Sequence, residues 1–388
     1  MKATWYKRRP ARLKNENSGE KIYGSPEFSA RHEIKLCTLF RESMKPFITT
    51  KKLSLLSTPC GNTVRAIIFV AACALPLCAT AQKSLKPAET AAAWPTRPVR
   101  ILVGFPGGST PDMSARTLAE PLARALGQPV IIENRVGASG NIAADQVAKA
   151  TDDHTLGVVI NGNLTSAKQL YPKLPYDPAK DFAPISLLTT APLMLVAPAS
   201  LPGGAEFFAA ARQNGSQWNY GSVGNGSVAH LGMELIKSRT PGMTPVQVPY
   251  PGNPQVVTAM LGGQIQMALI PPGIAMPHIR SGKLRAIGLA GGRSLLAPDV
   301  PPLADAGFKN VSLEVWTALI GPASLSKTAQ ERLAREVPRI IRDADTRQKL
   351  FAQGWQAVGT SPEGLKSRLK DETTLLGNII QTRGIKIE

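Results

Sequence analysis

Two glycine-rich loops, each between an apolar run and a helix-forming run, lie near each other in the sequence. In the first, the β-branched run Val99–Val103 leads into Phe105-Pro106-Gly107-Gly108, and a helix can begin at Pro111 because proline suits the first helical position. In the second, Val130–Ile132 leads into Gly137-Ala-Ser-Gly140 and an alanine-rich segment. The N–H groups at such helix starts have no partner inside the helix and can bind a carboxylate or a phosphate. The two loops therefore predict an anion-binding edge of a sheet.

Strand-like and helix-like segments alternate through residues 94–388. This alternation is typical of α/β proteins that have parallel sheets with helices on their faces. Separate strands are predicted at Ile185–Leu188 and Leu193–Ala197, and helices at Pro111–Leu126, Asn141–Lys149 and Val228–Lys237. The length is enough for two lobes, because single cores stop growing at about 250–300 residues.

Two distant segments share one pattern, which suggests where the chain crosses between the lobes. They are Leu195-Val-Ala-Pro-Ala-Ser-Leu-Pro202 and Leu319-Ile-Gly-Pro-Ala-Ser-Leu-Ser326. If the chain leaves the first lobe at one and returns at the other, residues 94–197 and 319–388 form the first α/β lobe and residues 198–318 form the second. Chance similarity between two strand ends is the alternative.

The N-terminal part of the chain predicts export. All four cysteines lie before residue 82, which excludes disulfides, catalytic thiols and cysteine-based metal sites from the rest of the chain. After Arg65, an apolar run leads to Cys78-Ala-Thr-Ala81, a typical cleavage site before Gln82. We therefore predict that residues 1–81 are a disordered extension and a signal peptide, and that the mature protein is periplasmic.

Two points about this N-terminal part stay open. Val70-Ala-Ala-Cys73 also fits a lipoprotein signal, which would give a lipid-anchored mature form instead of a soluble one. Met44 is an alternative start to Met1.

The charge distribution argues against a nucleic-acid partner. About half of the net charge of +18 lies in residues 1–65, and the remainder is spread without runs. Nucleic-acid binding favours Lys and Arg clustered with aromatic residues, but aromatic residues make up only 5% of the chain and are scattered. A mildly basic body instead suits the attraction of small anions.

From Trp94 onwards the chain carries a series of short motifs in a fixed order. They are Trp94-Pro-Thr-Arg-Pro98, Phe105-Pro-Gly-Gly-Ser-Thr-Pro-Asp112, Gly127-Gln-Pro-Val130, Glu133-Asn-Arg135, Gly140-Asn-Ile-Ala-Ala-Asp145, Leu174-Pro-Tyr-Asp177, Asp181-Phe-Ala-Pro184, Gly224-Asn-Gly-Ser227 with His230-Leu231, Val248-Pro-Tyr250 and Leu261-Gly-Gly263. In these motifs the chain resembles the Bug-type, or TctC-like, substrate-binding receptors of tripartite tricarboxylate transporters.

The resemblance implies a two-domain periplasmic-binding-protein type II fold, or flytrap, with two crossing hinge strands. It also implies a monomeric receptor that captures a small organic carboxylate through main-chain N–H groups and waters from both lobes, and presents it to a membrane permease. Dicarboxylates, tricarboxylates, acidic amino acids and aromatic acids all stay open as ligands. Ala259 and Gln266 stand where relatives often carry aspartate, so the second-lobe contacts can differ in this chain.

Ligand-binding residues of the first lobe are expected in its loops. Glycine lets the backbone approach a ligand closely, and the hydroxyl groups that follow add donors beside the helix start. An aspartate in the first turn either caps the helix or contacts the ligand, and asparagines after a strand either form a turn or face the ligand. The expected residues are Phe105, Gly107, Gly108, Ser109, Thr110, Asp112, Asn161 and Asn163.

The second lobe is expected to add a helix start of its own. Ser222, Asn225, Gly226 and Ser227 precede the helix predicted at Val228. Tyr250, in a motif of the family, completes the expected ligand-binding set.

Three further side chains are expected to have structural roles. His230 follows Ser227 by three residues, and we favour a hydrogen bond at the helix end over a hydrolase-like pair. Arg116 and Arg135 are expected to brace the loops through ion pairs.

Two classes of enzyme share parts of this pattern. A nucleotide-dependent enzyme shares the strand, the glycine-rich turn and Glu133, but Pro106 interrupts the dinucleotide fingerprint. A hydrolase would need a Gly-x-Ser-x-Gly elbow or a metal cluster, and the sequence contains no such elbow and few histidines. We therefore expect a binding protein without catalysis, cofactor or metal. A secreted or periplasmic hydrolase, or an orphan ligand sensor without a transport partner, is the alternative.

Overall fold

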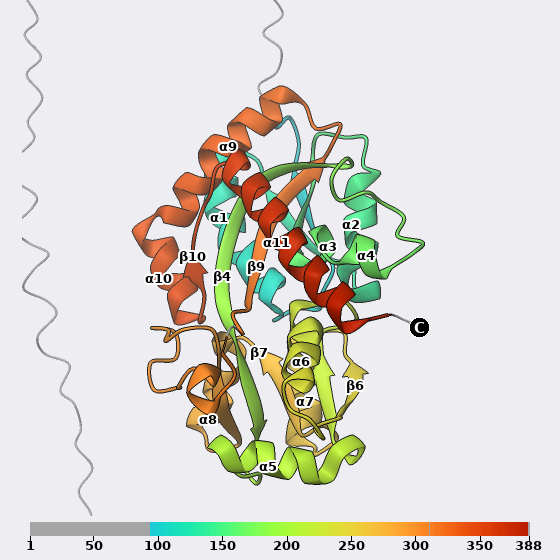
Figure 1. Ribbon diagram of the computed structural model, residues 1–388. Coiled ribbons are helices and arrows are strands. Elements are labelled where there is room, and N and C mark those ends of the chain that lie inside the picture. Colours follow the sequence, from blue (N-terminus) through green and yellow to red (C-terminus); the bar gives the residue numbers. More distant parts are fainter. Residues whose placement is uncertain (1–93, 310, 387–388) are drawn as a thin grey trace, which may run out of the picture. The chain divides into compact units, whose positions relative to one another are not determined.

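The computed structural model describes residues 94–309 and 311–386 (Figure 1). The predicted signal peptide, the four cysteines and the two alternative start residues lie outside these residues. Within the described ranges, no helix combines the length and the apolar character needed to cross a membrane.

The first lobe is built on a sheet with the strand order β2-β1-β3-β9-β4. Its strands are β1 (Val99–Val103), β2 (Val130–Asn134), β3 (Thr155–Ile160), β9 (Glu314–Pro322), the first part of β4 (Phe182–Pro198) and the short β10 (Gln356–Ala357). Its helices are α1 (Thr110–Leu126), α2 (Asn141–Ala148), α3 (Asn161–Leu164), α4 (Ala167–Leu170), α9 (Lys327–Arg342), α10 (Ala344–Ala352) and α11 (Pro362–Arg383). One core cluster packs α1, α9 and α10 on one face of the sheet, and another packs α2, α3 and α11 on the opposite face.

The second lobe is built on a sheet in which β8-β4-β7-β5-β6 are neighbours. Its strands are β5 (Asn219–Ser222), β6 (Val246–Pro249), β7 (Met267–Ile270), β8 (Leu284–Ala290) and the last part of β4. Its helices are α5 (Gly204–Asn214), α6 (Val228–Ser238), α7 (Asn253–Leu261) and α8 (Pro272–Arg280). One cluster packs α5 and α6 on the sheet, and another packs α7 and α8.

A single strand, β4, belongs to both sheets. Residues 182–192 pair with β9, and residues 193–198 pair with β7 and β8. The prediction of two separate strands at Ile185–Leu188 and Leu193–Ala197 was therefore wrong. In Figure 1 β4 runs in green beside the orange β9 and continues into the lower sheet.

The crossing strands make the sheet mixed, whereas the sequence pattern predicted parallel sheets. β9 pairs antiparallel with both β3 and β4, and β4 pairs antiparallel with β7 and β8. The strands that alternate with single helices, such as β1, β2 and β3, do pair in parallel. The lobe boundaries after residues 197 and 318 stay a proposal. The pairing of β4 changes from β9 to β8 between residues 192 and 193.

Helix α9 starts directly after the second copy of the repeated Pro-Ala-Ser-Leu pattern. Ser326 is the N-cap, and its Oγ accepts a hydrogen bond from Ala329 N at 3.3 Å. Loss of such a cap costs about 1 kcal/mol, so Ser326→Ala should lower the free energy of unfolding by that amount in a urea titration. Ser324 is exposed and caps no helix, and its Oγ donates an exposed hydrogen bond to Ala150 O at 3.1 Å. Ser324→Ala should therefore change this free energy by less than about 0.5 kcal/mol. Equal effects of the two substitutions would contradict the capping role.

Candidate functional site

The loop between β1 and α1 forms the first-lobe side of the candidate site. Ser109 is the N-cap of α1, and Thr110 and Pro111 are its first two residues, so the helix begins one residue earlier than predicted. Gly108 has φ +76°, in the left-handed region that favours glycine. The Ser109 side chain is only 2% exposed, and its Oγ has no hydrogen-bond partner among the described residues. A buried, unpaired hydroxyl beside a helix start is suited to bind a polar ligand atom.

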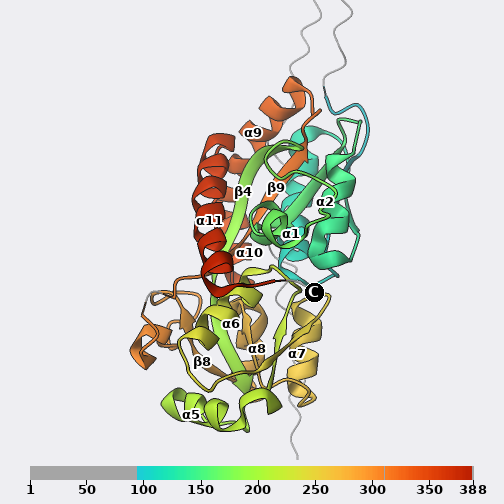
Figure 2. The same ribbon diagram turned by 45° about the vertical axis from the view of Figure 1, so that its right-hand side comes forward.

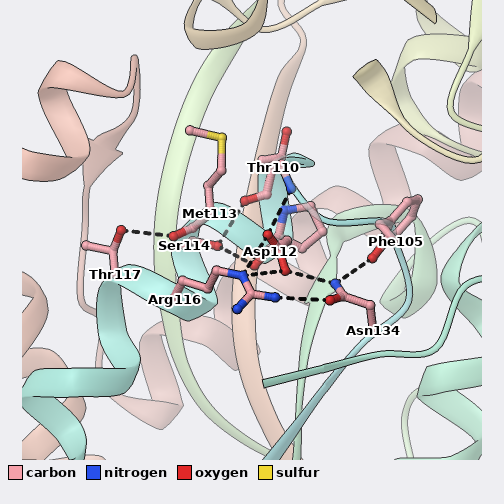
Figure 3. Close-up of polar contacts among 10 residues, drawn as sticks. Phe105, Thr110, Asp112, Met113, Ser114, Arg116, Thr117 and Asn134 are labelled. Carbon is pink, nitrogen blue, oxygen red and sulfur yellow. Dashed lines mark hydrogen bonds and ion pairs between the residues drawn. The ribbon is translucent and has the colours of Figure 1, made fainter. Parts of the chain in front are cut away.

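The side chain of Asp112 holds this loop in place through hydrogen bonds. Its carboxylate accepts hydrogen bonds from Gly108 N at 2.9 Å, from Asn134 Nδ2 at 2.8 Å and from Arg116 Nε at 3.0 Å (Figure 3). Burial alone would raise the pKa of Asp112, but the hydrogen bonds from Arg116, Asn134 and Gly108 together hold it below its usual value. These contacts favour the capping interpretation over direct contact with a ligand.

Asn134 and two arginines complete the support of the loop. Asn134 Nδ2 also donates to Phe105 O at 2.8 Å. Arg116 and Arg135 form ion pairs with Asp112 and Glu133, which confirms their predicted bracing role. Hydrogen bonds from Arg100, and then from Arg135, hold the pKa of Glu133 at about 2.

The start of α7 in the second lobe faces the start of α1. Asn253 Nδ2 donates to Thr110 Oγ1 at 3.3 Å. A Cβ added to Gly252 would lie only 2.9 Å from Pro106 Cγ, so the two lobes are in close contact at this point. The sequence analysis missed Asn253, although Asn253-Pro254 repeats the polar-proline signal of Thr110-Pro111 at a helix start.

The loop before α6 is held by internal hydrogen bonds. Ser222 Oγ accepts hydrogen bonds from Gln247 Nε2 at 2.8 Å and from Gly224 N at 3.2 Å. Ser227 caps α6 by accepting from His230 N at 3.3 Å, and its own Oγ donates to Gly224 O. Tyr250 is half-buried beside this loop, and its N–H donates to Ser222 O at 2.8 Å.

His230 has the structural role that the sequence favoured. Its Nδ1 accepts a hydrogen bond from Gly226 N at 3.1 Å, so it is not paired with the hydroxyl of Ser227. Burial lowers the pKa of His230, which leaves the ring neutral at pH 7 and able to accept. In the described part of the chain, no group of three His, Cys, Asp or Glu side chains is placed to hold a metal ion.

Asn161 and Asn163 lie in α3, directly after β3, and both are buried. Asn163 Nδ2 donates to Ser139 O at 2.9 Å, and its Oδ1 accepts from Ile160 N at 3.3 Å. Asn161 Nδ2 donates to Glu314 O and Glu372 Oε1, whereas its Oδ1 has no partner among the described residues. Both asparagines therefore support the loop, and only Asn161 keeps an unpaired polar atom.

The segment from α3 to Tyr171 contacts the second-lobe loop directly. Ser166 Oγ donates to Gly226 O at 2.6 Å, and Tyr171 Oη donates to Asn225 O at 3.0 Å. Sequence reasoning missed Ser166 and Tyr171, because nothing in their local pattern distinguishes them from ordinary helix and turn residues.

The fold therefore brings the predicted loops of both lobes together around the starts of α1, α6 and α7. Over residues 114–385 the chain matches the family described as the tripartite tricarboxylate transporter family receptor. The chain belongs to this receptor family.

Sequence relatives and solved structures agree with this assignment. The receptor is 31% identical to the protein BugT of Bordetella pertussis, over 76% of this chain and 92% of BugT. It is 31% identical to the structure of MatC from Rhodopseudomonas palustris with bound malate, with a TM-score of 0.70, over 74% of this chain and all of MatC. It is 30% identical to Rpa4515 of the same organism with adipate, with a TM-score of 0.72, over 76% of this chain and 99% of that structure.

These findings confirm the predicted family and fold class, a two-lobed periplasmic solute-binding receptor of the Bug type. The family is one of solute-binding receptors, which fits the expectation that the chain is not an enzyme. The two residues that depart from the family pattern, Gln266 and Ala259, both contact other parts of the second lobe. Gln266 Oε1 accepts a hydrogen bond from Asn219 N at 2.8 Å, and Ala259 is a residue of α7 that is buried in the second-lobe core.

Proposed function

We propose that the protein is an exported receptor that binds a small organic carboxylate between the starts of α1, α6 and α7 and presents it to a membrane permease. The observation that carries this proposal is the direct apposition of α1 and α7, with Asn253 Nδ2 3.3 Å from Thr110 Oγ1. Helix starts carry unpaired N–H groups and the positive end of the helix dipole. Two helix starts that face each other from different lobes suit an anion that both lobes enclose.

The ligand contacts in this proposal are main-chain N–H groups and bridging waters. Thr110 N and Asn253 N lie in the first turns of their helices, and the buried Ser109 hydroxyl is a further donor. Hydrogen bonds to a charged group contribute about 1.5–3 kcal/mol each. Four to six of them could reach the ~8 kcal/mol of micromolar binding after the cost of association.

The relatives support a choice among the candidate classes of ligand. MatC binds malate and Rpa4515 binds adipate, and both are dicarboxylates. We place dicarboxylates first, and tricarboxylates, acidic amino acids and aromatic acids after them. Residues 1–81 would act as the signal peptide for export to the periplasm, and the mature receptor would be a monomer.

Thermal unfolding in the presence of candidate ligands tests this proposal. The set should include malate, adipate, succinate, citrate, glutamate and benzoate, with sugars and nucleotides as controls. A ligand at 100 times its Kd adds about 2.7 kcal/mol of stability, which raises the midpoint by about 4 °C for a folded part of about 300 residues. We expect the rise for one class of carboxylate alone. A rise with nucleotides or sugars and none with any acid would contradict the proposal.

The permease requires a second experiment, because an orphan sensor would bind the same acid. Uptake of the radiolabelled acid into cells should fall when the receptor gene is deleted and return on complementation. Unchanged uptake would favour the orphan sensor.

A further inference from the structure

The C-terminal helix α11 packs on the cores of both lobes. Its first half carries Leu365, which is buried in one cluster with Trp316 of β9. Its second half carries Leu376 and Ile380, which are buried in one cluster with Leu231 of α6. Figures 1 and 2 show this helix in red, running along the first lobe and ending beside α6. α11 therefore bridges the two lobes alongside the crossing strands.

Between these two halves, α11 carries a buried carboxylate. Glu372 is only 6% exposed. It accepts hydrogen bonds from Asn161 Nδ2 at 2.6 Å, from Trp316 Nε1 at 2.5 Å and from Arg368 Nε at 3.0 Å. Burial raises the pKa of Glu372, although the three donors oppose this rise. A buried charge is by itself weak evidence for a gain in stability. In some proteins such a group instead fixes one conformation of the fold.

The same network reaches both crossing strands. Arg368 Nη2 pairs with Glu314 Oε2 of β9 at 3.1 Å. Glu314 Oε2 also accepts a hydrogen bond from Thr190 Oγ1 of β4 at 3.3 Å. The charged groups that face Glu372 are thus Arg368 of its own helix and, through it, Glu314.

The other end of the network is the first-lobe segment that contacts the second lobe. Asn161 is the first residue of α3, and the contacts of Ser166 and Tyr171 to Gly226 O and Asn225 O follow within ten residues. We propose that Glu372 is a positioning residue that, by holding Asn161 against Trp316, fixes residues 161–171 against the second-lobe loop 224–227. This role concerns how the lobes are held together, and it does not depend on which ligand binds.

Hydrogen exchange of the full chain without ligand, followed by mass spectrometry, tests this role. Glu372→Gln keeps the size of the side chain but leaves one acceptor oxygen for the donors that two oxygens now serve. We expect protection of the amides in residues 161–171 and 224–227 to fall about tenfold, which corresponds to about 1.4 kcal/mol. Asn161→Ala should give the same loss of protection, because it removes the donor of the hydrogen bond that joins α3 to Glu372.

Leu333→Ala is the matched control for a loss of stability alone. Leu333 is a residue of α9 that is fully buried in the first-lobe core, and it belongs to a different cluster from the residues of α11. It should lower protection across the first lobe without a selective loss at residues 224–227. Unchanged protection at 224–227 in Glu372→Gln, or the same selective loss in Leu333→Ala, would overturn the proposal. If no acid raised the midpoint of thermal unfolding, the hydrogen-exchange result would be unaffected. The proposed function and the proposed role of Glu372 can therefore be contradicted independently.

Discussion

Replacing Gly252 by valine should weaken ligand binding about 10- to 100-fold while leaving the fold intact. A Cβ at this position would lie 2.9 Å from Cγ and 3.0 Å from Cδ of Pro106, a rigid ring in the facing lobe. Overpacking of such a contact costs about 1–3 kcal/mol, and each 1.4 kcal/mol is a factor of ten in affinity. The backbone of Gly252 has φ −172°, an extended conformation that any residue adopts, so the substitution adds no backbone strain. Calorimetric titration with the acid found in the unfolding experiment measures the change.

Gly292→Val is the matched control for Gly252→Val. Gly292 also lies in the second lobe, and a Cβ added there would meet no atom within 4 Å. This variant should bind the acid as the unaltered receptor does. Full affinity in Gly252→Val, or an equal loss in both variants, would show that contact between Pro106 and the start of α7 is not needed for capture.

Asp112→Asn should lower the free energy of unfolding by about 1.5–3 kcal/mol, the range for hydrogen bonds to a charged group. The asparagine retains one acceptor oxygen, whereas the carboxylate serves Gly108 N, Asn134 Nδ2 and Arg116 Nε. The ion pair itself contributes little, because the Arg116 side chain is 55% exposed. The loop that carries Gly107 and Gly108 should loosen, and the affinity for the acid should fall with it.

The pH dependence of this effect follows from the lowered pKa of Asp112. A carboxyl group whose pKa is lower in the folded state stabilises the fold above its unfolded pKa of about 3.9, and this stabilisation is lost as the pH falls through the folded value. The difference between the unaltered protein and Asp112→Asn should therefore be largest at neutral pH and shrink below about pH 4. Urea titrations at pH 7, 5 and 3.5 measure this difference.

Glu120→Gln provides the control for Asp112→Asn on the same helix. Glu120 forms the same i,i+4 pair with Arg124, but both side chains are more than half exposed. This variant should be within about 0.5 kcal/mol of the unaltered protein. A difference for Asp112→Asn that stays constant down to pH 3.5 would contradict the assigned role of its charge.

Local signals predicted the helices well where the chain carries caps. Helix α1 begins within one residue of its predicted start, because Ser109, Thr110 and Pro111 are each suited to their helix-start positions. Helix α6 begins at the predicted Val228, where Ser227 supplies the cap. These elements depend on neighbouring residues, and the sequence contains that information.

Tertiary contacts decided the elements that the sequence did not predict. Pro192 cannot donate a main-chain hydrogen bond to a neighbouring strand, yet it lies inside β4 and pairs with Glu314 where β4 passes from one sheet to the other. The four-residue helices α3 and α4 are too short for a periodic signal and depend on contacts such as Ser166 to Gly226 O. β9 is antiparallel to β4 because the chain leaves the first lobe along β4 and returns to it along β9. The pattern of residues within a strand does not encode this direction.

The candidate site was predictable to the same extent. The first-lobe loop was found because glycines, hydroxyls and a proline coincide there, and the supporting role of Asp112 was one of two open alternatives. Asn253 could have been predicted as well, since Asn253-Pro254 is a helix-start signal like Thr110-Pro111. The burial of Glu372 could not have been predicted, since a lone glutamate in a mostly polar helix is usually exposed.

The position of β9 in the sheet also has a consequence for the order in which the protein can form. β3 and β4 have no direct pairing with each other, and each instead pairs with β9, which lies more than a hundred residues further along the chain. A chain that leaves the ribosome from its N-terminus therefore has a gap between β3 and β4 in the first sheet until residue 322, the last of β9, has been made. The strands β5 to β8 of the second lobe are synthesised as one uninterrupted stretch before that point. Of the two sheets, the one in the lobe that begins the described chain is thus the last that can be finished.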